Sequence, residues 1–235
     1  MLNVKMYFMI AIQFLALSAW AAIPPKSSKV YDILQLPSAN QKSLIDKGSD
    51  HLYRDFVQLA FDDKTSMKVR WKALMAAAQI RKEKSTGDLI KASKDSQWFM
   101  RTAAMAALEE YNPEASELIA KNLLKDKALV VRSAAADILS RNFSTSSRSL
   151  FWEELHQKYN FKNKQSLWIR PQIFAALAQK PLDQETNLFS KMLKEPELKM
   201  QLIAVRGLEK LTGMKLGESS TSPTQVVHLW QSYYK

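Results

Sequence analysis

The sequence predicts an all-α protein, a right-handed α-solenoid of about five helical hairpins with a helical cap at each end. Three observations predict this fold: a repeated arginine motif, helical periodicity around each copy, and a composition that excludes many other folds. Four arginines each directly follow an apolar residue, and in a fifth copy of the motif a glutamine replaces the arginine. Successive copies are separated by 31, 31, 38 and 31 residues. The five copies are Val69-Arg70, Met100-Arg101, Val131-Arg132, Ile169-Arg170 and Met200-Gln201.

Each copy of the motif opens a predicted second helix of a hairpin. Small or apolar residues follow at positions three, six and seven, which defines one buried stripe; in the second copy they are Ala104, Ala107 and Leu108. The preceding segments are also helical in pattern. One hairpin cannot bury both of its apolar faces, so neighbouring hairpins must stack. We expect the first helices at residues 50–61, 86–92, 113–124, 147–159 and 184–193.

An acidic residue precedes the arginine in most copies: Asp63, Asp95, Asp126 and, in the weakest copy, Glu195. At these residues the chain resembles HEAT repeats, particularly the short bacterial exported kind. That family places an aspartate in the turn within a repeat and an arginine six residues later, as in Asp95 with Arg101 and Asp126 with Arg132. The resemblance covers about residues 48 to 235. It implies a structural polar ladder between successive turns, formed by Asp63, Arg70, Asp95, Arg101, Asp126, Arg132 and Arg170.

The fourth unit departs from this pattern. Asn163 or Lys164 stands where the acid belongs, and about seven residues are inserted nearby. We expect the polar stretch 143–149 to be a spacer between units, with a functional loop as the alternative. Pro171 directly follows Arg170, and a proline in the second turn of a helix is expected to bend it.

The ends of the chain predict a leader and two caps. Residues 1–21 resemble a signal peptide, because Lys5 precedes an apolar run and Ala19 and Ala21 are small enough for a cleavage site. We expect cleavage after Ala21 and a periplasmic or secreted protein; an uncleaved N-terminal membrane anchor is the alternative. Residues 22–47 are expected to cap the repeats at 48–213, and residues 214–235 to form a C-terminal capping helix. We expect the tryptophans at 71, 98, 152, 168 and 230 to close the core rather than to anchor a partner.

The composition excludes several classes of site. The 235 residues contain no cysteine, which excludes disulfides, thiolate zinc sites, iron–sulfur clusters and cysteine nucleophiles. Five glycines leave no glycine-rich phosphate loop, and three histidines argue against a histidine metal site. Adjacent acidic pairs such as Glu109/Glu110 point about 100° apart on a helix and form no shared carboxylate site. We therefore expect no catalytic residue, no metal and no cofactor.

The predicted function is that of an exported, non-catalytic scaffold that binds a protein or peptide along its concave face. The net charge of +11 favours an acidic partner, or alternatively an anionic membrane or cell-wall surface; a solvated lysine surface is the plainer explanation. Nucleic acid is disfavoured. The resemblance also implies enzymatic alternatives, a DNA glycosylase or a bilin lyase, but both activities are intracellular. The candidate concave positions are Lys72, Met75, Glu110, Asp137, Arg141, Gln172, Arg206 and Lys210.

Overall fold

The computed structural model describes residues 28–141 and 143–235, so the predicted signal peptide lies outside the described residues. The chain divides after Arg81 into two compact units. We call residues 28–81 unit 1 and the described residues of 82–235 unit 2. No helix in these described parts is both long enough and apolar enough to cross a membrane.

Unit 1 consists of one helical hairpin and two covering helices. The hairpin is formed by α4 (Asp50–Ala60) and α5 (Met67–Arg81), and α4 begins where the Ser49 hydroxyl accepts a hydrogen bond from the Leu52 N–H. The covering helices α2 (Ser28–Gln35) and α3 (Ser38–Asp46) contact this hairpin. The expected N-terminal capping segment therefore contributes two helices to the core of unit 1.

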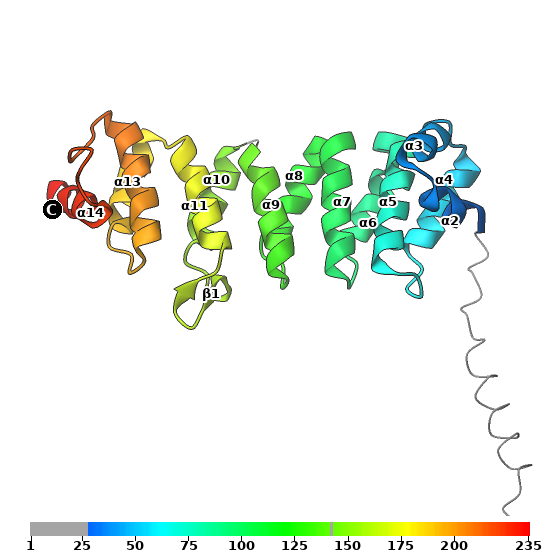
Figure 1. Ribbon diagram of the computed structural model, residues 1–235, viewed down its shortest axis with the longest axis horizontal. Coiled ribbons are helices and arrows are strands. Elements are labelled where there is room, and N and C mark those ends of the chain that lie inside the picture. Colours follow the sequence, from blue (N-terminus) through cyan, green and yellow to red (C-terminus); the bar gives the residue numbers. More distant parts are fainter. Residues whose placement is uncertain (1–27, 142) are drawn as a thin grey trace, which may run out of the picture. The chain divides into compact units, whose positions relative to one another are not determined.

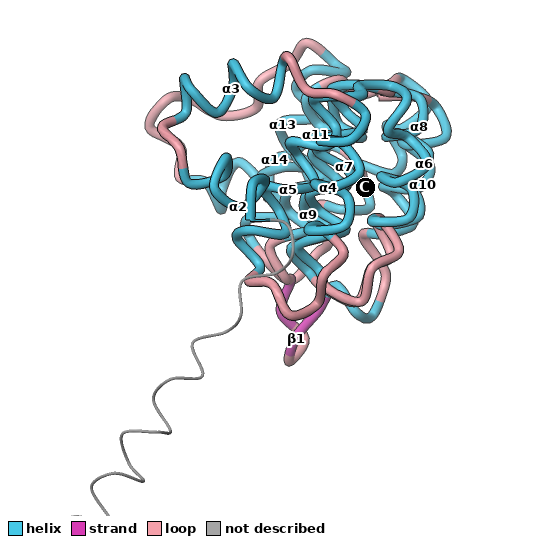
Figure 2. The backbone as a smooth tube through the Cα atoms, turned by 90° about the vertical axis from the view of Figure 1, so that its right-hand side faces the viewer, coloured by secondary structure: helices cyan, strands magenta, loops and turns pink. Residues whose placement is uncertain are grey.

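Unit 2 stacks four helical hairpins, as the sequence pattern predicts. Its second helices pack in series, α7 on α9, α9 on α11 and α11 on α13. Figure 2 shows these helices in one layer, with α6, α8 and α10 in another. This arrangement confirms the predicted all-α solenoid of stacked hairpins; its handedness stays a prediction. The hairpins are α6 (Thr86–Ala92) with α7 (Trp98–Tyr111), α8 (Pro113–Leu123) with α9 (Leu129–Arg141), α10 (Thr145–Glu154) with α11 (Ile169–Gln179), and α12 (Thr186–Met192) with α13 (Leu198–Thr212).

The small residues of the repeated stripe allow the close helix packing. Ala104, Ala107 and Leu108 are fully buried on α7, and most of their equivalents in later copies are also buried. In the fifth copy the stripe has Gly207, where a Cβ atom would come within 2.4 Å of the Phe189 ring. The glycine therefore makes room for an aromatic side chain from α12, a contact that an alanine would block.

The inserted residues of the fourth unit lie elsewhere than expected. Residues 145–149 belong to α10, which is capped by the Ser144 hydroxyl accepting from the Ser147 N–H. The extra length lies in the turn between α10 and α11, which holds a short 3₁₀ helix (Lys158–Asn160) and the hairpin of β1 (Phe161–Lys162) and β2 (Gln165–Ser166). The expected spacer at 143–149 is thus mainly helical, and the true insertion is a β-hairpin that projects from unit 2 (Figure 1).

The hairpin and the proline each have a local explanation. Asn163 and Lys164 have φ values of 52° and 65°, the positive angles that a tight two-residue hairpin turn requires. The expectation that Pro171 lies in the second turn was wrong, because it is the third residue of α11 and lies in the first turn. A backbone N–H has no intrahelical acceptor there, so the proline displaces no hydrogen bond.

The C-terminal end of unit 2 is closed by α14 (Pro223–Tyr233), which packs against α13. Its N-terminus is a capping box formed by Ser222 and Gln225. Trp230 is completely buried and stacks on Tyr234 with ring centroids 6.1 Å apart. This tryptophan closes the core at the end of the repeats.

Candidate functional site

The turn arginines of unit 2 bind the turn of the following repeat. Arg101 Nε and Nη2 each donate to one carboxylate oxygen of Asp126 at 2.6 Å, and Nη1 donates to the carbonyls of Asp95 and Ser96 in its own turn. The Arg101 and Asp126 side chains are only 6% and 7% exposed. One guanidinium therefore caps its own turn and connects it to the next, as a structural ladder requires.

The next two steps of the ladder use different partners. Arg132 donates to the carbonyl of Asp126 and to the side-chain oxygen of Asn160, at 2.7 and 3.1 Å. The amide of Asn160, rather than Asn163 or Lys164, thus takes the place of the missing acid. Arg170 is fully buried and donates to Glu195 at 2.9 Å and to the carbonyl of Leu155 at 2.6 Å.

The last copy keeps half of the interaction. Gln201 Nε2 donates to the carbonyl of Glu195, six residues earlier, at 2.7 Å. Arg101 and Arg132 make the same six-residue contact with their own turns. The amide therefore retains the cap on its own turn although the charged connection to a following turn is lost.

In unit 1 the acid assignment was wrong by one residue. Asp62, not Asp63, accepts the hydrogen bonds of the turn, from Lys64 N–H at 3.0 Å and from the Thr65 hydroxyl at 2.9 Å. Asp63 is exposed. Arg70 is buried, and its Nε donates to the carbonyl of Ala60 at 2.8 Å. Asp62 lies eight residues before Arg70, so the six-residue spacing of the later copies does not indicate it.

A buried carboxylate lies beside the Arg132 step. Glu154 is inaccessible to solvent, and the Tyr159 hydroxyl donates to its carboxylate at 2.8 Å from each oxygen. Asn160 Nδ2 donates to the same carboxylate at 3.1 Å. Burial raises the pKa of Glu154, and these hydrogen bonds offset only part of the effect. Burial, reinforced by Glu154, also raises the pKa of the Tyr159 phenol.

This environment predicts that Glu154 costs stability at neutral pH. A carboxyl whose pKa is raised by folding contributes stability in acid, and that contribution is lost as the pH rises through its folded pKa. We expect Glu154→Gln to be more stable than the wild type at pH 7, with a difference that shrinks toward pH 4.5, the ordinary glutamate pKa. Urea unfolding across this range measures it. The exposed neighbour provides the control, Glu153→Gln, which should change the free energy of unfolding little. A Glu154→Gln difference that does not vary with pH would contradict the assignment.

The predicted concave positions of unit 2 lie on its second helices, but several are engaged locally. Gln172 donates to the carboxylate of Asp137 at 2.6 Å, which joins α9 to α11. Arg141 forms a two-point ion pair with Glu109 at 2.5 and 2.7 Å. Glu110 is exposed on α7. In unit 1, Lys72 is half-buried with its Nζ 3.3 Å from the carbonyl of Leu34, and Met75 is half-buried as well.

A groove lies between α11 and α13, on the face of unit 2 that carries the predicted concave positions. It consists of two adjoining hollows of about 600 and 480 Å³, which share Ala175, Ile203 and Arg206 in their walls. Among the predicted positions, Gln172, Arg206 and Lys210 line it. The apolar part of the lining consists of Trp168, Pro171, Ala175, Ala178, Leu198, Leu202 and Ile203.

The charges along this groove are mostly positive. Lys199, Arg206, Lys210 and Lys215 line it against one acidic residue, Glu209. Lys210 Nζ donates to the carbonyl of Gln179 at 2.9 Å. Arg206 is exposed and forms no ion pair with any residue that the structure describes. The groove therefore offers an apolar floor and an uncompensated guanidinium.

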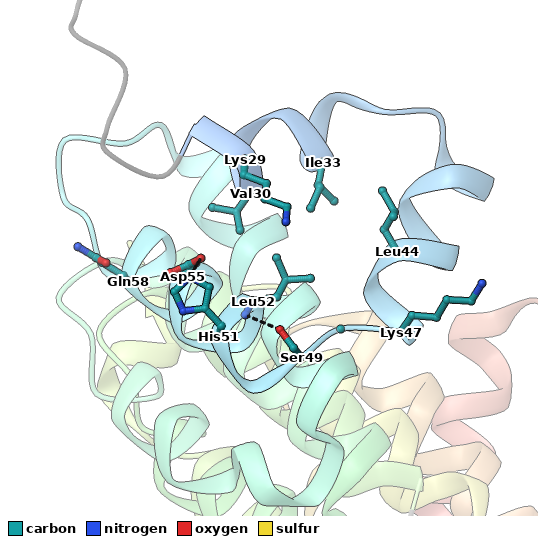
Figure 3. A pocket seen from close by; sticks show the side chains of 11 residues that line it. Lys29, Val30, Ile33, Leu44, Lys47, Ser49, His51, Leu52, Asp55 and Gln58 are labelled. Carbon is teal, nitrogen blue, oxygen red and sulfur yellow. Dashed lines mark hydrogen bonds and ion pairs between the residues drawn. The ribbon is translucent and has the colours of Figure 1, made fainter.

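A separate hollow, of about 610 Å³, lies within unit 1 among α2, α3 and α4. Figure 3 shows Ile33, Leu44 and Leu52 converging on it, while Lys47 extends from its rim. His51 lies 3.5 Å from Asp55 in its wall. Its charged lining has both signs, so it selects no charge class of ligand and is the weaker candidate.

Sequence reasoning missed the exposure of two tryptophans. Trp98 and Trp168 are 41% and 59% exposed, so the expectation that they close the core was wrong for these two. Trp152 is half-buried and packs edge-on against Phe174 and Phe189. A signal was available: three second helices of unit 2 begin with a bulky apolar residue three positions before the repeat arginine or its glutamine replacement, and Trp168 directly precedes the fourth.

The candidate catalytic groups are dispersed. His156 is exposed, and His228 Nδ1 lies 3.0 Å from the side chain of Gln231. Across 28–141 and 143–235, no group of three histidine, cysteine, aspartate or glutamate residues is arranged to hold a metal ion.

Comparison with known families finds a match over part of the chain. Residues 54–140, which include the first three arginine motifs, match the family of HEAT repeats. This part of the chain is similar to HEAT repeats. These repeats generally serve as scaffolds for protein–protein interaction, and the family is typically non-catalytic. The hairpins α10/α11 and α12/α13 continue the same arrangement beyond the matched residues. No curated protein shows significant sequence similarity to this chain.

Proposed function

We propose that the protein is a non-catalytic scaffold that holds an acidic protein segment in the groove between α11 and α13. One observation carries this proposal: Arg206 lies exposed and without an ion-pair partner among the described residues, above an apolar floor. An apolar side chain of the partner would fill the hollow beside Ala175 and Ile203, and a neighbouring carboxylate would pair with the guanidinium.

The fold supports this mode of binding. The ladder fixes the turns, and the interaction of Gln172 with Asp137 holds α11 against α9. A wall that is rigid before binding loses little conformational entropy when a partner is bound. The groove also lies on the helices that carry the predicted concave positions, so an extended segment could continue across neighbouring repeats.

Selection of random displayed peptides on the full chain tests the proposal. We expect the enriched peptides to share one large apolar residue flanked by aspartate or glutamate. Peptides without acidic residues, or peptides whose binding is unchanged by Arg206→Glu, would contradict the proposed occupant. Both outcomes are read from the peptide sequences and from binding of the synthesised peptides.

The site of action of this scaffold follows from the predicted leader. Export to the periplasm or the exterior, with cleavage after Ala21, places the partner among exported molecules. Intact mass spectrometry that finds, in the cell-envelope fraction, a protein whose first residue is Ala22 would support export. A full-length species in the cytoplasm would contradict it and would return DNA to the list of partners.

A further inference from the structure

The four turns of unit 2 form one continuous edge. The contacts of Arg101, Arg132 and Arg170 connect each turn to the next, so the turns must lie side by side. Figure 1 shows the β-hairpin projecting from the same edge. We define the turn edge as residues 94–98, 125–130, 158–168 and 194–199.

The acidic residues of the turn edge are occupied internally. Asp126 binds Arg101, Glu195 binds Arg170, and Glu197 accepts the Ser166 N–H at 2.7 Å. Asp95 accepts the Gln97 N–H at 2.8 Å. The lysines of the same turns are all exposed and form no ion pairs with described residues. They are Lys94, Lys125, Lys127, Lys158, Lys162, Lys164, Lys194 and Lys199.

Exposed apolar side chains are interleaved with these lysines. Trp98, Val130, Trp168 and Leu198 are 41%, 38%, 59% and 40% exposed, one in each turn of unit 2. Each lies within one residue of the first residue of a second helix. Second helices begin at this edge and first helices end there, so their dipoles oppose one another. The lysines therefore determine the charge of the turn edge.

We propose that the turn edge binds the surface of an anionic lipid bilayer. Lysines near such a surface are attracted to acidic headgroups, and tryptophan side chains favour the interface between headgroups and hydrocarbon. Val130 and Leu198 gain free energy by entering the acyl region, whereas aliphatic side chains cannot stack on nucleic-acid bases. The mixture of lysine, tryptophan and aliphatic residues thus fits a bilayer better than a nucleic acid.

This surface is separable from the groove by mutation. Trp168, Leu198 and Lys199 lie at the mouth of the groove and belong to both surfaces. Trp98, Lys127 and Lys162 belong to the turn edge and are not part of the groove lining. Variants at these three positions therefore test the bilayer proposal without altering the proposed peptide site, and either proposal can fail alone.

Sedimentation with lipid vesicles tests the charge of the turn edge. The full chain should bind vesicles of one part phosphatidylglycerol to about three parts phosphatidylcholine, and bind far less to phosphatidylcholine alone. Lys127→Glu/Lys162→Glu should weaken binding at least about tenfold. The matched control is Lys84→Glu/Lys180→Glu, which makes the same charge change at the opposite edge of unit 2 and should have little effect. Because all variants share the same N-terminus, differences between them report on the substituted positions.

Fluorescence quenching by brominated phosphatidylglycerol tests contact with the bilayer. Quenching on binding should decrease in Trp98→Phe, which keeps an aromatic side chain, while vesicle affinity changes little. Equal loss of binding in the two lysine variants would overturn the proposal, as would quenching that does not depend on Trp98. Binding of duplex DNA without binding of vesicles would also overturn it and assign the edge to a polyanion.

Discussion

Arg101→Ala should lower the free energy of unfolding of the protein by about 3–5 kcal/mol. The substitution leaves the carboxylate of Asp126, which is only 7% exposed, without its guanidinium. It also removes the donor to the carbonyls of Asp95 and Ser96. Burying an unpaired charge is costlier than the pair itself is stabilising, because the carboxylate remains desolvated. Urea unfolding followed by circular dichroism measures the loss.

A second ion pair in unit 2 provides the control. Arg141 binds Glu109 through two hydrogen bonds, in the same two-point geometry as Arg101 and Asp126. Its side chains are 55% and 36% exposed, however, so Arg141→Ala should cost less than about 1 kcal/mol. If the two variants lose similar free energies of unfolding, burial does not determine how much the Arg101–Asp126 pair contributes to stability.

Arg206→Glu should weaken the selected acidic peptides at least about tenfold. The change places a carboxylate where the partner's carboxylate is expected, so attraction is replaced by repulsion. Because Arg206 is exposed, salt screens both effects, and the affinity difference should shrink as ionic strength rises. Isothermal titration calorimetry at two salt concentrations measures it.

The control for this prediction makes the same charge change away from the groove. Lys191 is exposed on the first helix α12 and is not part of the groove lining. Lys191→Glu should therefore leave the peptide affinity nearly unchanged. An equal effect of the two variants would assign the binding to the net charge of the protein rather than to the groove.

The repeat pattern predicted the second helices because small or apolar residues follow every copy of the motif at the same three positions. The stripe around Ala104, Ala107 and Leu108 fixes which face is buried, and a fully buried face needs a neighbouring helix. The distance from Asp126 to Arg132 likewise predicted a polar turn, although it did not say that the carboxylate would bind Arg101 of the preceding repeat. That choice depends on stacking, which a single repeat does not contain.

The repeat spacing could not predict the features that lie outside the repeated pattern. Asn160 takes the acid position through a 3₁₀ helix, and no fixed spacing indicates an amide there. The groove depends on Ala175 and Ile203, whose side chains have no chemical feature that distinguishes them from other apolar residues of the second helices.

The most direct test of the proposed function is a reciprocal charge exchange at Arg206. The selected acidic peptide and a version with lysine in place of its acidic residues are titrated into the wild type and into Arg206→Glu. We expect the acidic peptide to prefer the wild type and the lysine peptide to prefer the variant, so that exchanging both charges restores much of the affinity. If the lysine peptide binds the variant no better than it binds the wild type, Arg206 does not meet the partner's charge and the groove between α11 and α13 is not the binding site.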